Sequence, residues 1–159
     1  MKRSLQSFLL AATFAAPAVA QSQDVGLTLD VSPFFGQACG PVSCQPLPGG
    51  IVSMLQPRVL THYGAASSFY AVAIGLPGPC LQVPGFENVL LLSDPIIIIG
   101  AGMTSSPPFV PLPCDQGIAN ETLLLPAGLA IGLVFRIQSI GVTGSGVLAF
   151  SAAIEATIG

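Results

Sequence analysis

The chain has 159 residues, of which 52% are hydrophobic and only 7% are charged, and its formal net charge is −3. Its 4 basic residues cannot form the basic patch that nucleic acids and anionic membrane surfaces require, which excludes both as partners. The charged fraction lies far below the ~25% of typical soluble domains, and the 18 glycines and 15 prolines favour a turn-rich β protein over a disordered one.

Residues 1–20 have the three parts of a secretory signal peptide. Two positive charges follow Met1, an apolar core spans residues 8–16, and Ala18-Val19-Ala20 supplies the small residues that a signal peptidase reads. We therefore expect cleavage near Ala20 and a secreted, periplasmic or envelope-associated protein that begins near Gln21. Cleavage would remove two basic residues and leave two against seven acidic ones, so the mature net charge is 2 − 7 = −5.

Apolar residues recur with the period of β-strands along the mature chain. The expected strands are 25–31, 51–60, 67–75, 88–92, 96–99, 121–125, 129–138 and 147–158. Segment 67–75 is apolar on both faces and is therefore expected in the centre of a sheet. The expected connections all contain proline or glycine, and they are 32–50, 76–80, 93–95, 100–117 and 141–146.

The clearest alternation in the chain lies in segments 129–138 and 147–158. The residues expected to face inward are Leu129, Ile131, Leu133, Phe135, Ile137, Leu148, Phe150, Ile154 and Ile158. The residues expected to face outward include Arg136, Gln138, Ser151, Glu155 and Thr157.

Many short strands without a helical period predict an all-β fold. We expect an antiparallel β-sandwich, Ig-like or jelly-roll-like, with a small β-barrel as the alternative. Residues 64–159 would form the sandwich core, and residues 21–63 would form an N-terminal strand and a Pro/Gly/Cys-rich extension packed on it. No apolar stretch of the mature chain reaches the ~20 residues that a transmembrane helix needs.

Four cysteines, Cys39, Cys44, Cys80 and Cys114, follow the signal peptide. An even number in an oxidising compartment predicts two disulfides, and four cysteines allow three pairings that the sequence does not separate. Our preferred pairing joins Cys39 to Cys44 across a Gly-Pro turn and Cys80 to Cys114 around a long loop. A zinc site is not expected, because the spacings lack paired C-x₂-C motifs and the chain has one histidine.

The candidates for chemistry are few. His62 is the only histidine, and no G-x-S-x-G motif accompanies it, so a structural role is expected rather than a Ser-His-acid triad. The acids that could pair as in glycosidases are Glu87, Asp94, Asp115 and Glu121, and a calcium site would draw on Asp94, Asp115, Asn120 and Glu121. No calcium-loop motif is present, and Asp94 and Asp115 have positions typical of turns. We therefore predict no catalytic, cofactor-binding or metal-binding residues.

An ordered set of short features spans residues 64–159. These features are Phe69–Gly75, Pro79-Cys80, Val83–Gly85, Asp115–Gly117, Leu123–Pro126, Gly128–Ile131, Phe135–Gln138, Phe150-Ser151 and Ala156–Gly159. In this order they resemble a family of small secreted bacterial modules of unassigned function, although the Pro107-Pro108 loop is longer than that pattern. The resemblance implies a β-sandwich and export, and it supplies no catalytic residues.

The sparse charge, the cysteines and the lack of convergent reactive groups favour a non-enzymatic module with a structural, adhesive or interaction role in the envelope or outside the cell. The alternative is a module that binds carbohydrate or a small ligand, although tryptophan is absent and only 2 tyrosines are present. A secreted hydrolase is the third hypothesis. The sequence indicates no oligomeric state, and it leaves a protein or glycan partner in the envelope open.

Overall fold

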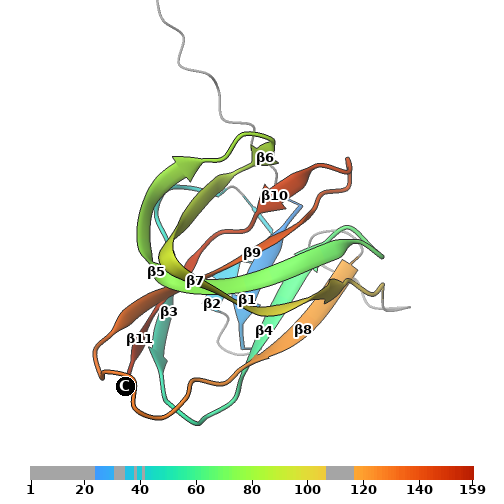
Figure 1. Ribbon diagram of the computed structural model, residues 1–159. Helices are drawn as coiled ribbons and strands as arrows, with labels where there is room; N and C mark the ends of the chain where they lie inside the picture. Colours follow the sequence, from blue (N-terminus) through green and yellow to red (C-terminus); the bar gives the residue numbers. More distant parts are fainter. Residues whose placement is uncertain (1–23, 31–34, 38, 41, 107–116) are drawn as a thin grey trace, which may run out of the picture.

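The computed structural model describes residues 24–30, 35–37, 39–40, 42–106 and 117–159, so the expected signal peptide (residues 1–20) lies outside the described residues. The described chain is all-β and contains no helix, and therefore no helix long and apolar enough to cross a membrane. Its strands form two sheets that pack face to face as a β-sandwich (Figure 1). The predicted fold class is confirmed, and the sheets do not close into the alternative barrel.

The smaller sheet is antiparallel and has four strands. In spatial order they are β2 (Phe35–Gln37), β1 (Gly26–Leu29), β4 (Arg58–Gly64) and β8 (Gly117–Leu123). The pairing of β4 with β8 joins strands from both sides of the domain boundary expected near residue 64. That boundary stays a prediction.

The larger sheet is built around β9 (Val134–Val142). One edge of β9 pairs with β5 (Phe69–Gln82), which in turn pairs with β7 (Val89–Met103). The remaining strands lie beyond the other edge of β9, and they are β11 (Ile154–Ile158), β10 (Leu148–Phe150), β3 (Leu47–Val52) and β6 (Phe86–Glu87). Strand β5 thus lies between two neighbours, and its expected central position is confirmed.

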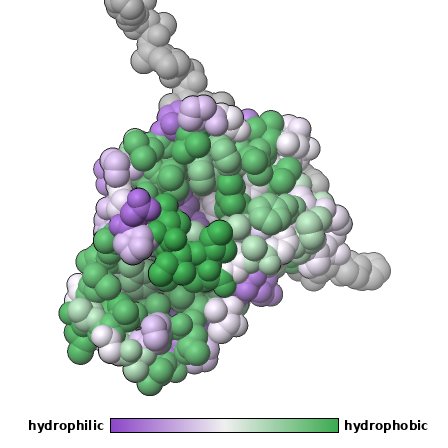
Figure 2. Space-filling view, viewed as in Figure 1, coloured by the Kyte–Doolittle hydropathy of each residue, from purple (hydrophilic) through white to green (hydrophobic). Residues whose placement is uncertain are grey.

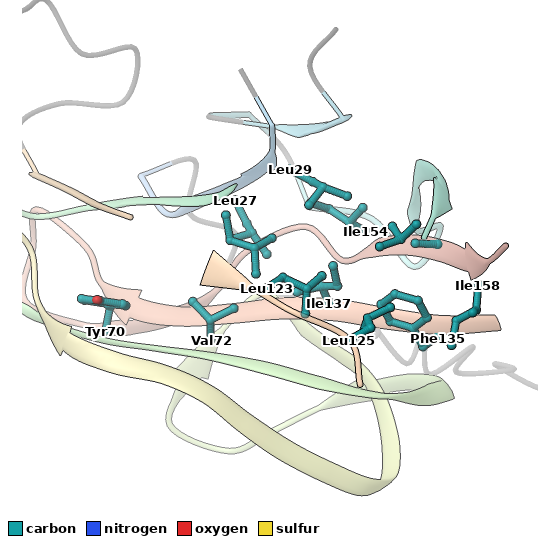
Figure 3. Close-up of a cluster of buried hydrophobic side chains, with 13 residues drawn as sticks. Leu27, Leu29, Tyr70, Val72, Leu123, Leu125, Phe135, Ile137, Ile154 and Ile158 are labelled. Atoms are coloured by element: carbon teal, nitrogen blue, oxygen red, sulfur yellow. The ribbon is translucent and has the colours of Figure 1, made fainter. Parts of the chain in front are cut away.

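The main core fills the space between the two sheets, as Figure 3 shows. Alternate residues point into this space because successive side chains of a strand face opposite sides of its sheet. Its most completely buried side chains are Leu27, Leu29, Leu60, Leu123, Ile137, Ile154 and Ile158. The inward positions predicted at Phe135, Ile137, Ile154 and Ile158 are confirmed, whereas Phe150 is buried on the outer face of the larger sheet, where it stacks on Phe86.

Strands β5 and β7 form one long hairpin that bends over the outer face of the larger sheet (Figure 1). The expected turn at 76–80 is wrong, because β5 continues through it, and β7 likewise continues through 93–95, where two strands were expected. Three register shifts interrupt the β5–β7 pairing, and such bulges bend and twist a hairpin. At Gly78 an added Cβ would lie 2.5 Å from the backbone of Leu92, so only glycine permits this close approach.

Polar side chains on the outer face of the larger sheet hold the bent hairpin down. The Nε2 group of Gln138 donates to the carbonyls of Val89 and Ser151, both at 2.8 Å, and its Oε1 accepts from the Leu91 amide at 2.9 Å. Nearby, Arg136 donates to the carbonyls of Gly78 (2.8 Å) and Leu91 (3.1 Å). The expectation that Arg136 and Gln138 point away from the core is therefore correct, but the hairpin buries Gln138.

A small second cluster of buried apolar residues fixes the hairpin from the same side. It consists of Val42, Val89, Leu91, Ala152 and Ala153, with Leu47 packed against it. Segment 32–50 is therefore more than the plain loop that the sequence predicts. It contributes to this packing, β2 belongs to the smaller sheet, and the start of β3 belongs to the larger sheet. Pairing with β11 makes β3 a strand despite its proline and two glycines.

Three further expectations are wrong. Segment 129–138 becomes a strand only from Val134, and Ile131, expected in the core, is 78% exposed on the preceding loop. Ser151, expected on the surface, is fully buried, and its hydroxyl accepts from the Ser139 amide and donates to the Ala152 carbonyl. Alternation predicted the faces of these strands, but it could not show which faces a second layer covers.

The disulfide pairing also differs from our preferred one. Cys44 is joined to Cys80, which takes one cysteine from each expected pair, so both expected pairs are wrong. Cys39 is disulfide-bonded as well, and Cys114 lies outside the described residues. The Cys44–Cys80 bond ties the far part of the hairpin to the segment before β3, a contact that exists only because the hairpin bends.

The buried amide of Gln138 provides a test of the bent hairpin. Substitution Gln138→Leu should lower the free energy of unfolding by at least about 2 kcal/mol, because it leaves buried backbone groups of β7 without partners. Chemical denaturation would measure the loss. The control is Gln82→Leu, since Gln82 is exposed and makes one bond of 3.2 Å to the Phe86 carbonyl. Equal, small effects of the two substitutions would contradict the proposed role of Gln138.

The Cys44–Cys80 bond joins two residues that are 36 positions apart in the sequence. The loss of such a cross-link, in the double substitution of both cysteines by serine, should lower stability by about 3–4 kcal/mol through the added freedom of the unfolded chain. Peptide mapping without reduction should recover the two cysteines in one linked fragment. Recovery of a Cys39–Cys44 fragment instead would contradict the structure.

Candidate functional site

His62 lies between the two sheets, near the middle of β4, and is fully buried. Its ring stacks on Tyr70 of β5, with 5.1 Å between ring centroids and 16° between planes. Its Nδ1 lies 2.9 Å from the Ser139 hydroxyl on β9. The Tyr70 hydroxyl in turn donates to Glu121 Oε1 on β8, at 2.6 Å. The structure thus brings a histidine, a serine and a carboxylate into one buried network.

This network does not have the geometry of a catalytic triad. In a triad the carboxylate bonds the histidine itself, whereas Glu121 bonds Tyr70. His62 is fully buried and the hydroxyl of the buried Ser139 is directed at its ring, so neither reactive group is exposed to solvent. The remaining ring nitrogen, Nε2, is buried without a hydrogen-bond partner and faces Gly141, where an added Cβ would lie 2.7 Å from it. The arrangement supports the structural role expected for His62.

Burial governs the protonation of this network. Removal from water lowers the pKa of His62 to about 4, because the charged imidazolium loses its hydration. Burial, the hydrogen bond to Glu121 and the charge of that carboxylate raise the pKa of Tyr70 to about 12. At neutral pH both rings are therefore uncharged, as their position between two apolar faces requires.

The acidic candidates lie on different strands. Glu87 is in β6, Asp94 in β7 and Glu121 in β8, while Asp115 lies outside the described residues. Asn120, the amide of the calcium hypothesis, accepts a hydrogen bond from Thr61 at 2.9 Å. In the described part of the chain, no three His, Cys, Asp or Glu side chains come close enough to hold a metal ion.

A different feature dominates the surface of the molecule. Ile96, Ile97 and Ile98, three consecutive residues of β7, are exposed by 43%, 53% and 67%. We call these three residues the isoleucine edge, because β7 pairs with β5 alone among the described strands and thus ends the sheet. Figure 2 shows this side of the protein as largely apolar.

An inner cavity of about 200 Å³ opens on one side of the isoleucine edge, where the main core reaches the surface. No polar side chain lines it, and its lining consists of Ile74, Gly75, Leu76, Pro95, Ile97, Leu125, Leu129, Leu133, Phe135 and Ile158. An apolar cavity of this size has room for a small hydrocarbon group.

An outer cavity of about 250 Å³ opens on the other side, beneath the bent hairpin. Its lining is Ala71, Ala73, Leu90, Leu92, Ile96, Ile98, Gln138, Ser139, Ile140 and Phe150. The amide of Gln138 is already bonded to the protein and is not available to a ligand. Together with the isoleucine edge, the two cavities form one apolar surface, which we take as the candidate functional site.

Only a weak signal in the sequence points to this site. Segment 96–99 was expected to be a short apolar strand, and its run of isoleucines has no polar alternation to indicate which face is buried. The bend at 76–95, which decides that both faces stay exposed, depends on contacts with Arg136 and Gln138 that lie far away in sequence.

Comparisons with known proteins add little. No family model matches the chain, and no curated protein matches it. A solved structure with a similar arrangement is an AA10 lytic polysaccharide monooxygenase from Streptomyces lividans, with a TM-score of 0.37 and 17% sequence identity. The alignment covers 77% of this chain and 61% of that structure. A likeness at this level assigns no activity, substrate or metal to this chain.

The same comparison corrects one prediction. The expectation that the protein is not an enzyme is contradicted, since a protein of similar arrangement is an enzyme. We therefore do not retain the non-enzymatic assignment.

The buried His62 predicts acid sensitivity. Because its pKa is about 4 in the folded chain and 6.5 in the unfolded one, the unfolded chain binds an extra proton between these values. Stability should therefore fall as the pH drops from about 6.5 to about 4, by about 3 kcal/mol from this group. Denaturant unfolding at pH 7 and pH 4.5 would measure the change.

The matched variant is His62→Phe, which keeps a ring against Tyr70 but does not titrate. The ion pairs of Asp30 with Arg58 and of Glu155 with Arg136 are the same in both proteins, so their contributions cancel in the comparison. The variant should lose most of the difference in stability between the two pH values. An unchanged difference would contradict the role assigned to His62.

Proposed function

We propose that the protein acts in the cell envelope or outside the cell as a β-sandwich interaction module that holds an apolar partner against the isoleucine edge and its two cavities. The observation that carries this proposal is the isoleucine edge itself. Three large side chains next to one another remain exposed on a strand that pairs with a single other strand in the described part of the chain. Contiguous exposed apolar surface of this kind typically marks a binding site.

The charges of the protein support an apolar partner. Both arginines of the described chain are engaged internally, Arg58 with Asp30 and Arg136 with Glu155. No charged side chain lines the inner or the outer cavity. Binding at this site would therefore depend on the burial of apolar area. The free energy gained is roughly proportional to the apolar surface removed from water.

The location is part of the proposal. The Cys44–Cys80 disulfide fits an oxidising compartment outside the cytoplasm. Cleavage near Ala20 and membership in the family of small secreted bacterial modules that residues 64–159 resemble remain proposals, and both agree with this location.

Carbohydrate binding has less support. Sugar rings usually stack on exposed aromatic side chains, and the only strongly exposed aromatic ring among the described residues is Phe69. Both tyrosines are buried, and Phe86 and Phe150 stack on each other. The described surface therefore offers no pair of aromatic rings for a sugar.

An apolar fluorescent dye such as anilinonaphthalene sulfonate tests the proposed site. In dilute solution the native protein should enhance dye fluorescence, and the double substitution of Ile97 and Ile98 by asparagine should remove at least about half of the enhancement. The control is Ile51→Asn. Ile51 is about as exposed as Ile98, at 69% against 67%, and lies on β3 at the opposite edge of the sheet. Equal dye signals from all three proteins would refute the proposed site.

A further inference from the structure

We propose that the inner cavity is a binding site for one uncharged alkyl chain of about six to eight carbons, which enters beside Ile97 and ends against the main core. This inference rests on the proposed function and names the chemical class of its ligand. The isoleucine edge then forms the entrance to the site.

The first step is the lining of the inner cavity, which comes from several elements of the fold. Ile74 lies on β5, Ile97 on β7 and Leu133 on the loop before β9. Phe135 and Ile158 complete the inner end, and Figure 3 shows them side by side in the main core. Because every lining residue is apolar, a hydroxyl, amide or charge inside the cavity would lose its hydration without gaining a side-chain partner. The lining therefore selects hydrocarbon.

The second step is the fixed position of the loop that forms one wall. Residues 124–133 connect β8 to β9 and contain neither a charged nor a polar side chain. The Leu125 carbonyl accepts from the Leu55 amide at 3.0 Å, and the Leu133 carbonyl accepts from the Ile158 amide, also at 3.0 Å. Since these bonds place two lining residues before a ligand arrives, little ordering opposes binding.

The third step is the volume of the cavity, about 200 Å³. An engineered apolar cavity of about 150 Å³ binds benzene, so the inner cavity has room for a somewhat larger hydrocarbon. An apolar side chain of a protein partner would also fit, but it would bring peptide groups to the rim, where no lining side chain can bond them. A single alkyl chain brings no such groups and is the better match.

The fourth step is the charge beside the entrance. Phe135 precedes Arg136 in the sequence, but Arg136 lies on the opposite face of the sheet, where it pairs with Glu155. Pro95, at the entrance, follows Asp94, which is exposed. The negative charge of Asp94 disfavours an anionic head group at this position. A chain with a neutral head group therefore fits better than one that ends in a carboxylate.

Nuclear magnetic resonance titration of the exported protein with straight-chain alcohols, from butanol to decanol, tests the site. The dissociation constant should fall about threefold to fourfold with each added methylene, as the burial of one such group predicts. The gain should become smaller beyond about eight carbons, when the cavity is full. A series without any gain, or with an undiminished gain through decanol, would overturn a cavity of this volume as the site.

Two neighbouring substitutions distinguish the inner cavity from the outer one. Ile97→Asn places an amide in the inner lining and should raise the dissociation constant of octanol at least about tenfold. Ile98→Asn changes the outer lining and should alter that constant by less than about twofold. A larger effect of Ile98→Asn than of Ile97→Asn would contradict the assignment to the inner cavity.

A second variant fills the inner cavity instead of changing its polarity. Leu133→Trp should weaken octanol binding at least about tenfold, because the larger side chain occupies the space of the ligand. The control is Ile131→Trp on the same loop, since Ile131 is 78% exposed and lines neither cavity. Thermal unfolding would identify any variant that is not folded. Equal octanol binding by the two folded tryptophan variants would refute the site.

Comparison of octanol with octanoate tests the selection against anions. Octanoate should bind at least about threefold more weakly, and Asp94→Asn should bring the two dissociation constants closer together. Equal binding of both ligands to the native protein would contradict an uncharged ligand.

The outcomes also separate this inference from the proposed function. If no alcohol binds at the inner cavity but the dye signal still depends on Ile97 and Ile98, the alkyl ligand is wrong and the proposed function survives with a protein as the alternative partner. If the dye signal does not depend on these residues and no alcohol binds, both proposals fail.

Discussion

The hydrogen bonds that Arg136 and Gln138 make to the bent β5–β7 hairpin organise the outer half of this protein. Strand β9 sends Phe135 and Ile137 into the core, and it sends Arg136 and Gln138 to the opposite face. Without those outer bonds the Leu91 amide and the carbonyls of Val89 and Leu91 would lose their side-chain partners, which is costly for buried backbone groups. The second apolar cluster, the Cys44–Cys80 bond and the outer cavity all depend on this bend.

The same bend explains why the isoleucine edge is exposed. Where the hairpin turns over the sheet, its far part covers Gln138, but the part of β7 that carries the isoleucine edge remains the last described strand of the sheet. The side chains of Ile96, Ile97 and Ile98 therefore stay exposed. The internal use of both arginines leaves this part of the surface without a compensating charge. The proposed binding surface and the architecture of the sheet thus have a common structural origin.

His62 shows the opposite arrangement, in which a polar group is enclosed by the core. Its stacking on Tyr70 and its bond to Ser139 offset part of the cost of burial, while Nε2 remains without a partner. Gly141 provides the space that the ring occupies. We expect the resulting neutral histidine to tie the stability of the sandwich to pH.

The sequence by itself determined the local properties. Alternation identified β1, the centre of β5 and the inward faces of β9 and β11, because the two-residue period of a strand is a property of neighbouring residues. It also determined the all-β class and the sparse charge.

Only the tertiary structure decided the course of the hairpin through Pro77 and Pro95, the pairing of Cys44 with Cys80 and the burial of Gln138 and Ser151. Each of these depends on contacts between residues far apart in the chain, which no local pattern encodes. The exposure of the isoleucine edge follows from them, since a run of apolar residues indicates that burial is favourable but not which surface provides it.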